Sequence, residues 1–316
     1  MYDFVTEDNY AEKMENTVLP YVSSRRKDGM FASFDGKELH FAYFKADEPK
    51  AVVAILHGFT ESIEKFPELT YYFLQQGYSV YILEQRGHGK SYRKVEDLTL
   101  THVDRFEEYV EDFSRFSKEI IKTDLPRFLY AHSMGGAVAA LCLEKNSCDF
   151  KKAVLSSPMI SPTSGGVPHF MSRFICKLFM IFGKKEERLF LFSEYKGHED
   201  FKTSSAESEA RFRYYDEIKF ANKEYQNCAP TYSWSYESLG VTKKILKKGA
   251  PEGIKIPVLL FQAKKDTTVI NKEQDRFISR VPNGKKEEFD TKHEIYRSPD
   301  GIMKPFLDRL FGFFEE

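Results

Sequence analysis

The sequence has few cysteines and no excess of charge of either sign, and each of these scarcities excludes a class of protein. Its four cysteines, among 316 residues, form no CxxC pair and no cysteine–histidine cluster with zinc-finger spacing. They are too few for a disulfide scaffold at this length, so we expect reduced thiols. The 47 basic and 48 acidic side chains leave a formal charge of −1, which gives no global field to attract nucleic acid.

Long hydrophobic runs are also missing. The most apolar stretch, residues 174–182, is interrupted by Lys177 and is far shorter than the ~20 residues that span a bilayer. The N-terminal residues carry acids and no apolar run, unlike a secretory signal, so we expect a cytoplasmic protein. Core-forming residues are abundant, with 41% hydrophobic side chains and 29 Phe, which excludes wholesale disorder. The length suggests two domains, or one large α/β domain with an insertion.

Short aliphatic runs alternate with longer amphipathic stretches along most of the chain. A hairpin is predicted at residues 30–34 and 39–44, split by Asp35-Gly36. Buried strands are predicted at residues 51–56, 79–83, 127–131, 152–155 and 257–261, and a weaker one at 287–289. Helices are predicted at residues 62–76, 102–122, 134–145, 272–279 and 301–314. This alternation indicates an α/β protein with a mostly parallel, doubly wound sheet.

One segment breaks the alternation. Residues 161–249 contain no convincing buried strand, but Phe-rich amphipathic stretches separated by Ser, Thr and Pro turns. We interpret this segment as a helical cap inserted between two strands of the sheet. The sheet domain is then divided into a first part, residues 1–160, and a second part, residues 250–316.

A serine lies at a sharp turn between a predicted strand and a predicted helix. The sequence Ala131-His132-Ser133-Met134-Gly135-Gly136 has the pattern G-x-S-x-G of a nucleophile elbow, with alanine for the first glycine. The turn must be tight to lift the serine hydroxyl clear of the strand, so its neighbours must be small. The start of the helix offers a backbone N–H and a favourable dipole to an oxyanion. The alternative is a serine that only caps the helix.

The loop after the strand at 51–56 reads Leu56-His57-Gly58-Phe59. An oxyanion hole needs a second backbone N–H from a loop in this position. Gly58 permits the unusual backbone path that such a loop requires. We therefore predict that the N–H groups of Phe59 and Met134 form the oxyanion hole.

A serine nucleophile needs a base, and the base needs an acid that orients it. In proteins with this elbow the acid and then the histidine follow the serine along the chain. His293 follows the last predicted strand, and Asp266 follows the strand at 257–261. Asp290 and Glu294 compete for the role of the acid, but they lie beside His293 in sequence and would reach its far nitrogen with difficulty. The predicted catalytic residues are therefore Ser133, Asp266 and His293.

The loop Glu84-Gln85-Arg86-Gly87-His88-Gly89-Lys90-Ser91 contains Gly-Lys-Ser, which resembles the end of a phosphate-binding P-loop. A P-loop needs glycine at position 84, where this chain has Glu84. We therefore interpret the loop as a rigid rim of the active site, with Arg86 and His88 in structural roles.

The inserted segment is both basic and aromatic. Residues 171–196 carry six basic and three acidic side chains, interleaved with Phe, Leu and Ile. Such a helix can make transient contact with a membrane surface, or it can be a lid that packs its apolar face on the core, and the two interpretations are compatible. The large side chains expected to line an acyl pocket under the cap are Phe170, Phe174, Phe179, Phe182, Tyr232 and Trp234.

With these motifs in place, the chain resembles the α/β-hydrolase superfamily, and within it the branch of lysophospholipases and monoacylglycerol lipases. The resemblance is carried by residues 57–59, 84–91 and 131–136, the Asp266 loop and His293, and more weakly by residues 205–213 and 229–234 of the cap. It implies a mostly parallel eight-stranded sheet flanked by helices, a helical cap and a Ser-His-Asp mechanism without a metal or organic cofactor. The departures are Ala131 for the usual glycine and Glu84 where monoacylglycerol lipases often have Asp.

The function that this resemblance implies is hydrolysis of the acyl ester of lysophospholipids. Monoacylglycerol lipase and general carboxylesterase are the alternatives. A dehalogenase or epoxide hydrolase would have Asp at position 133, and a non-enzymatic binding protein on this scaffold commonly lacks a member of the triad. The sequence leaves the head group, the acyl length and the oligomeric state open.

Overall fold

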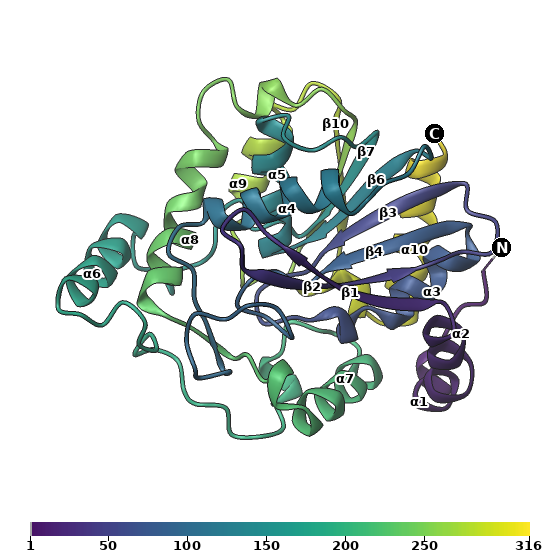
Figure 1. Ribbon diagram of the computed structural model, residues 1–316, viewed down its shortest axis with the longest axis horizontal. Helices are drawn as coiled ribbons and strands as arrows, with labels where there is room; N and C mark the ends of the chain where they lie inside the picture. Colours follow the sequence, from purple (N-terminus) through teal and green to yellow (C-terminus); the bar gives the residue numbers. More distant parts are fainter. Residues whose placement is uncertain (1) are drawn as a thin grey trace.

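The computed structural model describes residues 2–316 and contains a central sheet of eight strands (Figure 1). The strand order is β1-β2-β4-β3-β6-β7-β9-β10, with β1–β2 and β2–β4 antiparallel and all other pairs parallel. These strands are β1 (Arg26–Ala32), β2 (Glu38–Phe44), β3 (Ala51–Leu56), β4 (Tyr78–Leu83), β6 (Arg127–His132), β7 (Lys152–Ser156), β9 (Val258–Ala263) and β10 (Gly284–Phe289). The predicted architecture is confirmed, and all predicted strands are present.

Helices cover both faces of the sheet. They are α1 (Tyr10–Lys13), α2 (Leu19–Ser23), α3 (Pro67–Gln75), α4 (Glu107–Glu119), α5 (Met134–Glu144), α6 (His169–Ile181), α7 (Glu209–Ala221), α8 (Tyr232–Ile245), α9 (Asn271–Ile278) and α10 (Asp300–Glu315). Alternate residues of β3 enter two separate cores, one under α4, α5, α8 and α9, and the other under α3, α10 and the N-terminal helices. Because β3 is covered on both faces, every one of its residues is buried, as its continuous apolar run predicts.

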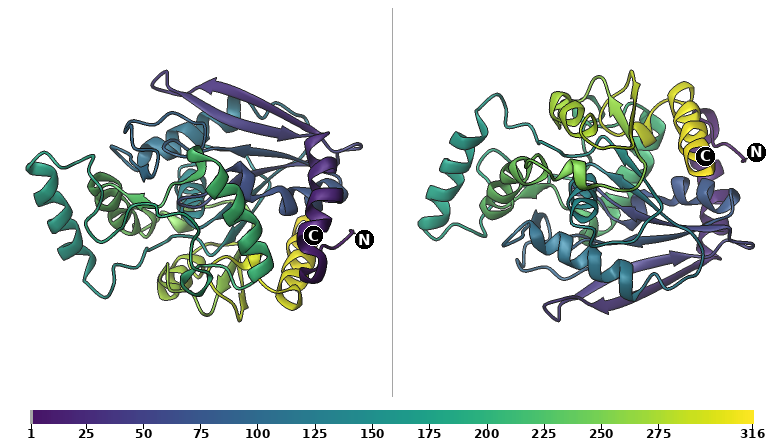
Figure 2. Two further views of the ribbon diagram at one scale, coloured as in Figure 1. Left: turned by 90° about the horizontal axis from the view of Figure 1, so that it is seen from below. Right: turned by 90° about the horizontal axis from the view of Figure 1, so that it is seen from above.

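The N-terminal helical run is absent from the predictions. Residues 10–23 form α1, a π-helical turn and α2, and their buried side chains join the core under α3 and α10. The apolar positions Tyr10, Met14, Val18 and Val22 recur every four residues, so the pattern was available in the sequence. The two chain ends lie together at the end of the molecule opposite α6 (Figure 2).

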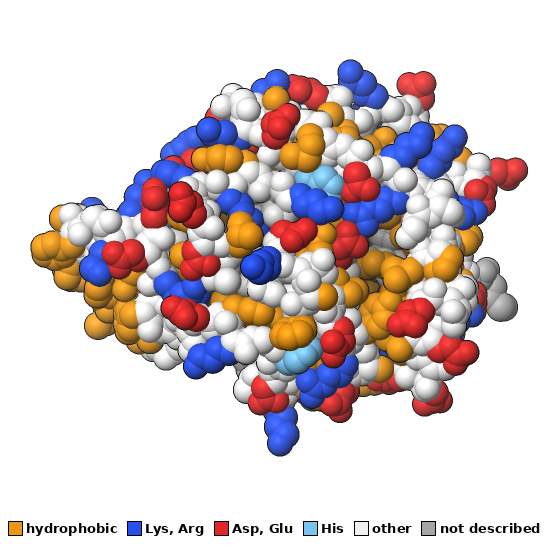
Figure 3. Space-filling view, turned by 60° about the horizontal axis from the view of Figure 1, so that its bottom comes forward, with side chains coloured by type: hydrophobic (Ala, Val, Ile, Leu, Met, Phe, Trp, Pro, Cys, Tyr) orange, Lys and Arg blue, Asp and Glu red, His pale blue; other side chains and the backbone are white. Residues whose placement is uncertain are grey.

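Three helices of the segment between β7 and β9 pack in different ways. Helix α8 buries Trp234, Val241 and Ile245 in the core that also contains α4, α5 and α9. The strand just before α8, β8 (Ala229–Pro230), pairs with β5 (Leu100–Thr101). Helix α6 lies outermost and packs against α8 (Figure 1). Its outward side is apolar, and hydrophobic side chains gather at this end of the molecule (Figure 3).

This arrangement corrects part of the predicted acyl pocket. Phe170, Phe174 and Phe182 are among the most exposed apolar side chains of the protein, so they do not line an internal pocket. The reason is that α6 contacts α8 through Arg173 and Phe179 and leaves Phe170 and Phe174 on its outward side. Phe179 and Tyr232 do face inward, and their rings stack with centroids 4.6 Å apart.

Helix α7 is fixed to the core by a buried arginine. The Arg211 guanidinium is fully buried and forms ion pairs with Glu68 of α3 and Asp300 of α10, at 3.1 and 3.0 Å. It also donates to the carbonyl of Val5 at 2.8 Å. Arg211→Ala would leave the Glu68 carboxylate buried without its partner, so we expect it to lower the free energy of unfolding by about 3–5 kcal/mol. Urea unfolding measures this loss.

A matched control is available two residues along the same helix. Arg213 is half exposed and its ion pair is with the exposed Glu209, so Arg213→Ala is expected to cost less than about 0.5 kcal/mol. Equal stabilities of the two variants would contradict the anchoring role of Arg211.

No helix among residues 2–316 is long and apolar enough to cross a membrane. All four cysteines are free thiols, as expected.

Candidate functional site

Ser133 lies at the sharp turn from β6 into α5 and adopts φ +52°, a conformation that L-residues rarely take. The turn is held by hydrogen bonds from Ser133 N–H to the Ser156 carbonyl and from Met159 N–H to the Ser133 carbonyl. A Cβ at Gly135 would come within 2.4 Å of the Leu56 carbonyl oxygen, so only glycine permits this approach of α5 to β3. The small residues that the elbow pattern demands are therefore explained by contacts between backbones.

The structure brings Ser133, His293 and Asp266 together. The distance from Ser133 Oγ to His293 Nε2 is 2.8 Å, and from His293 Nδ1 to Asp266 Oδ2 it is 2.6 Å. Ser133 and His293 are buried, as is the carboxylate of Asp266. Asp290, by contrast, is largely exposed beside Lys265, and Glu294 points away from His293 toward Lys65 and Arg297.

Burial and neighbouring charges shift the pKa values of His293 and Asp266 in opposite directions. Burial alone would lower the pKa of His293, but the adjacent Asp266 carboxylate outweighs it and raises the pKa above its ordinary value. Burial alone would raise the pKa of Asp266, but the His293 imidazole and the N–H groups of Val269 and Thr268 lower it. Asp266 is therefore ionised at neutral pH, and it favours the imidazolium form of His293.

Two backbone N–H groups beside Ser133 have no hydrogen-bond partner among residues 2–316. They belong to Met134, the first residue of α5, and to Phe59, in the loop after β3. The two segments are close, because a Cβ at Gly58 would lie 3.1 Å from the Ser133 Cβ. These are the two N–H groups that the sequence predicts for an oxyanion hole.

A buried cluster of charges under the Phe59 loop is missing from the predictions. The Glu61 carboxylate accepts a hydrogen bond from Gly58 N–H and from the Tyr296 hydroxyl, and it pairs with Lys65 at 2.8 Å. Burial would raise the pKa of Glu61, but Lys65 and its other partners hold it well below the usual range. Lys65 also pairs with Glu294 at 2.7 Å. The ionised Glu61 carboxylate thus fixes the Phe59 loop. The acidic residue two positions after Phe59 was the feature of the sequence from which this contact could have been predicted.

The 84–91 loop is held from within by Glu84. Its carboxylate accepts the Lys90 N–H at 2.8 Å and contacts His40 Nδ1 at 2.8 Å. A Cβ at Gly89, where φ is +50°, would overlap this carboxylate. Position 84 therefore needs an acid for a structural reason, which agrees with the rejection of a P-loop.

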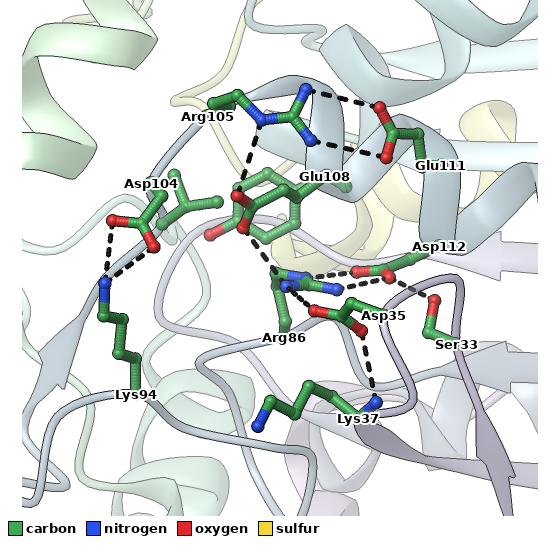
Figure 4. Close-up of polar contacts among 12 residues, drawn as sticks. Ser33, Asp35, Lys37, Arg86, Lys94, Asp104, Arg105, Glu108, Glu111 and Asp112 are labelled. Carbon is green, nitrogen blue, oxygen red and sulfur yellow. Dashed lines mark hydrogen bonds and ion pairs between the residues drawn. The ribbon is translucent and has the colours of Figure 1, made fainter.

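Arg86 of this loop is in the structural role that the sequence predicts. Its guanidinium pairs with Asp112 of α4 at 2.6 Å, and with Asp35 and Glu108 at 3.1 Å (Figure 4). The contacts tie the loop to the β1–β2 turn and to α4. Among the described residues, no group of three or more His, Cys, Asp or Glu side chains is arranged to hold a metal ion.

A cleft of about 600 Å³ opens beside the Phe59 loop. Its lining includes Phe59 and Thr60 of this loop and residues of the inserted segment such as Phe192 and Tyr215. Its lining also contains buried charged side chains of both signs, among them Lys65, Lys219, Asp216, Glu294 and Arg297. The cleft can therefore hold an apolar group and a polar group of one ligand at the same time.

Comparisons with known proteins agree with this geometry. A family model described as serine aminopeptidase, S33, matches residues 47–296. The chain is 29% identical over 257 residues to lysophospholipase L2 of Escherichia coli (strain K12), which covers 80% of this chain and 74% of that protein. It is 32% identical over 151 residues to a monoacylglycerol lipase of Mycolicibacterium smegmatis, covering 46% and 52% of the two chains.

The fold is also similar to that of solved structures. A soluble variant of monoglyceride lipase from Saccharomyces cerevisiae, in complex with a substrate analogue, superposes with a TM-score of 0.69 at 19% identity, covering 92% of this chain and 96% of that one. At this identity the likeness establishes the fold alone. The family match covers most of the chain, and so this protein belongs to the serine aminopeptidase S33 family of α/β-hydrolases, in the branch of lysophospholipases and monoacylglycerol lipases, and is an ester hydrolase.

Proposed function

We propose that this hydrolase cleaves the acyl ester of monoacyl lipids, lysophospholipids above all, through an acyl-enzyme on Ser133. The observation that carries the proposal is the continuous chain of contacts from Ser133 Oγ through the imidazole of His293 to the Asp266 carboxylate. A cleft lined by both apolar and charged side chains includes Phe59, from the loop that adjoins Ser133. The catalytic core comprises residues 1–160 and 250–316, and residues 161–249 form the cap.

The proposed mechanism has two half-reactions. His293 Nε2 takes the proton of Ser133 Oγ as the oxygen attacks the ester carbonyl, and the N–H groups of Phe59 and Met134 stabilise the oxyanion. Collapse of the tetrahedral intermediate breaks the ester bond, and the imidazolium protonates the leaving alcohol. A water molecule, deprotonated by His293, then attacks the acyl-serine and releases the fatty acid. This chemistry requires no metal or organic cofactor.

The substrate preference is inferred from the cleft and from the relatives. Its volume of about 600 Å³ favours one acyl chain over three. The preference for a lysophospholipid rests on the relative named lysophospholipase L2, which covers most of this chain. Monoacylglycerol is the second candidate, because another relative is named monoacylglycerol lipase.

The test of this proposal is hydrolysis of a panel of esters by the purified protein. We expect kcat/KM to be higher for lysophosphatidylcholine and monoacylglycerol than for triacylglycerol. The opposite order would overturn the preference for monoacyl lipids.

Activity is also expected to rise with acyl length. Each methylene buried in an apolar cleft contributes about 0.8 kcal/mol, so kcat/KM for p-nitrophenyl esters should increase about fourfold per carbon until the cleft is filled. Steady-state kinetics from acetyl to dodecanoyl esters measures the slope. A preference for the acetyl ester would indicate a small-ester carboxylesterase and exclude a lipid substrate.

The pH dependence follows from the direction of the His293 shift. The general base must be neutral, and Asp266 raises the pKa of His293, so activity is lost as the pH falls through a value above the ordinary 6.5. We therefore expect the acid limb of the kcat/KM profile to have its midpoint above about 6.5. A midpoint near 5 would mean that another group limits the reaction.

A further inference from the structure

Phe59, in the loop after β3, packs its ring on the only tryptophan of the chain. The ring centroids of Phe59 and Trp234 are 4.1 Å apart, and the ring planes are inclined by 34°. The ring of His88 meets Phe59 edge-on at 6.3 Å. Trp234 lies in the first turn of α8, within the inserted segment, so this contact joins the proposed oxyanion loop to the insertion.

The backbone of Phe59 is not held by hydrogen bonds. Neither its N–H nor its carbonyl is bonded to another group among residues 2–316, and the N–H must stay free if it is to bind an oxyanion. The next residue, Thr60, has φ +62°, a conformation that costs free energy and persists only where the surroundings impose it. The place of Phe59 therefore depends on the packing of its ring.

The peptide unit between Gly58 and Phe59 is oriented by His57. His57 Nε2 accepts the Gln85 N–H at 3.0 Å, so the proton of the ring is on Nδ1, which donates to the Gly58 carbonyl at 2.7 Å. The carbonyl and the N–H of one trans peptide unit point in opposite directions, so this bond turns the Phe59 N–H away from His57. His57 thus sets the direction of the N–H, and the packing of the Phe59 ring sets its place relative to Ser133.

Trp234 is itself held firmly by the core. Its indole Nε1–H donates to the Tyr109 hydroxyl at 3.2 Å, and its backbone N–H donates to Thr231 Oγ1 at 3.2 Å. In the same turn the Ser233 hydroxyl donates to the Val103 carbonyl at 2.7 Å. All of these residues are buried. The first turn of α8 is therefore bound to the segment that leads into α4, and the indole ring has a fixed place.

Trp234 is separated from the cleft beside the Phe59 loop. The sequence predicts it as part of the acyl pocket, but it is not among the described residues that line this cleft, and only 8% of its surface is exposed. Phe59 does line the cleft. A ligand in the cleft therefore contacts Phe59, and Trp234 acts on the reaction through Phe59.

We infer that Trp234 is a positioning residue for ester hydrolysis, which holds the Phe59 N–H at the place where the oxyanion forms. The inference rests on the proposed roles of Ser133 and Phe59. A displaced N–H weakens a hydrogen bond that exists in full only in the transition state, so loss of the Trp234 ring should lower kcat and leave KM nearly unchanged. A residue of the acyl pocket would instead change KM, and more so for longer chains.

The first test is the rate of hydrolysis of p-nitrophenyl acetate and dodecanoate by Trp234→Leu, counted per active site titrated with a fluorophosphonate. Complete removal of one oxyanion donor costs about 10²–10³-fold in kcat, so a displaced donor should cost on the order of tenfold to a hundredfold, equally for both esters. Trp234→Phe keeps an aromatic ring against Phe59 and should retain kcat within about threefold.

The second test shows whether Trp234 acts through Phe59. Phe59→Leu removes the same ring contact and keeps the backbone N–H, so it should lower kcat by a similar factor. Phe59 is half-buried, so this variant tests the contact without opening the core. The double variant Phe59→Leu with Trp234→Leu should be no slower than the slower single variant, because both changes remove one contact. Losses that multiply in the double variant would mean that the two side chains act separately, contrary to the inference.

Inhibitor binding separates the oxyanion from the acyl chain. A trifluoromethyl ketone accepts Ser133 Oγ at its carbonyl carbon as the serine proton passes to His293, and its oxygen becomes an oxyanion. The alcohol with the same alkyl chain forms no oxyanion. In Trp234→Leu the Ki of the ketone should rise by the factor by which kcat/KM falls, while the Ki of the alcohol stays within about threefold.

The matched control is Phe113→Leu, which replaces an aromatic side chain in the same core, where Phe113 stacks on Phe150 at 5.8 Å. It should lower the melting temperature as Trp234→Leu does and leave kcat within about threefold. Unchanged kcat in Trp234→Leu, or Ki values of ketone and alcohol that rise together, would overturn the inference. A wild-type protein that hydrolyses neither ester would contradict the proposed function itself, and this role of Trp234 with it.

Discussion

Ser133→Ala is expected to abolish labelling by a fluorophosphonate probe and to lower kcat/KM for a monoacyl ester by on the order of 10⁴-fold or more. The physical reason is that Ser133 Oγ lies 2.8 Å from the His293 base, which can take its proton as the oxygen attacks the ester. Without it, the N–H groups of Phe59 and Met134 still polarise the carbonyl, which leaves only the weak residual catalysis of an oxyanion hole.

Ser157 provides a matched control for this experiment. It is also buried, follows the neighbouring strand β7 and has φ +44°, but its hydroxyl has no hydrogen-bond partner within residues 2–316. Ser157→Ala should retain labelling and activity within a few-fold. Undiminished esterase activity in Ser133→Ala would contradict the mechanism directly.

The second large effect is expected for Asp266→Asn, which should lower kcat by about 10⁴-fold and leave the fold intact. Asp266 Oδ1 accepts the N–H groups of Thr268 and Val269, at 2.8 and 3.0 Å, and Oδ2 faces His293 Nδ1. An asparagine keeps its oxygen on these two N–H groups, so its NH₂ faces the imidazole. His293 Nδ1 must then accept, Nε2 carries the proton, and the base can no longer take the proton of Ser133.

The control for Asp266 is the competing acid next to His293 in sequence. Asp290→Asn should change kcat less than a few-fold, because Asp290 is exposed and pairs with Lys265. Circular dichroism and thermal unfolding should be unchanged in both variants. If Asp290→Asn were the severe change and Asp266→Asn mild, the assignment of the acid would be wrong.

The sequence predicted those parts of the fold and the candidate site that depend on local pattern. The strand 51–56 is a continuous apolar run because it is buried on both faces, and this requirement is visible without a structure. The elbow can be recognised in the sequence because position 135 must be glycine. Any side chain there would collide with the Leu56 carbonyl. Chain order then sufficed to select Asp266 and His293, which the structure places in contact.

The remaining features depend on contacts between distant segments. Glu61, Lys65 and Glu294 form one buried cluster, although Glu294 is far from the other two in sequence. Charged side chains are usually exposed, so nothing in the sequence indicated that these three would be buried together. The orientation of α6 could not be predicted either. An amphipathic pattern indicates that one side of a helix is apolar, but not whether that side faces the protein core or the solvent. For this reason Phe170, Phe174 and Phe182 were expected in the acyl pocket and are found on the surface.

The most direct test of the central claim uses three esters of one fatty acid, with glycerol, glycerophosphocholine and p-nitrophenol as the leaving alcohols, hydrolysed in the presence of methanol. If all three pass through the same acyl-Ser133, the ratio of methyl ester to free fatty acid must be identical, whichever alcohol departs. We predict one ratio for the three substrates and loss of both products in Ser133→Ala. A ratio that changes with the leaving alcohol, or products that persist in Ser133→Ala, would contradict an acyl-enzyme at this serine.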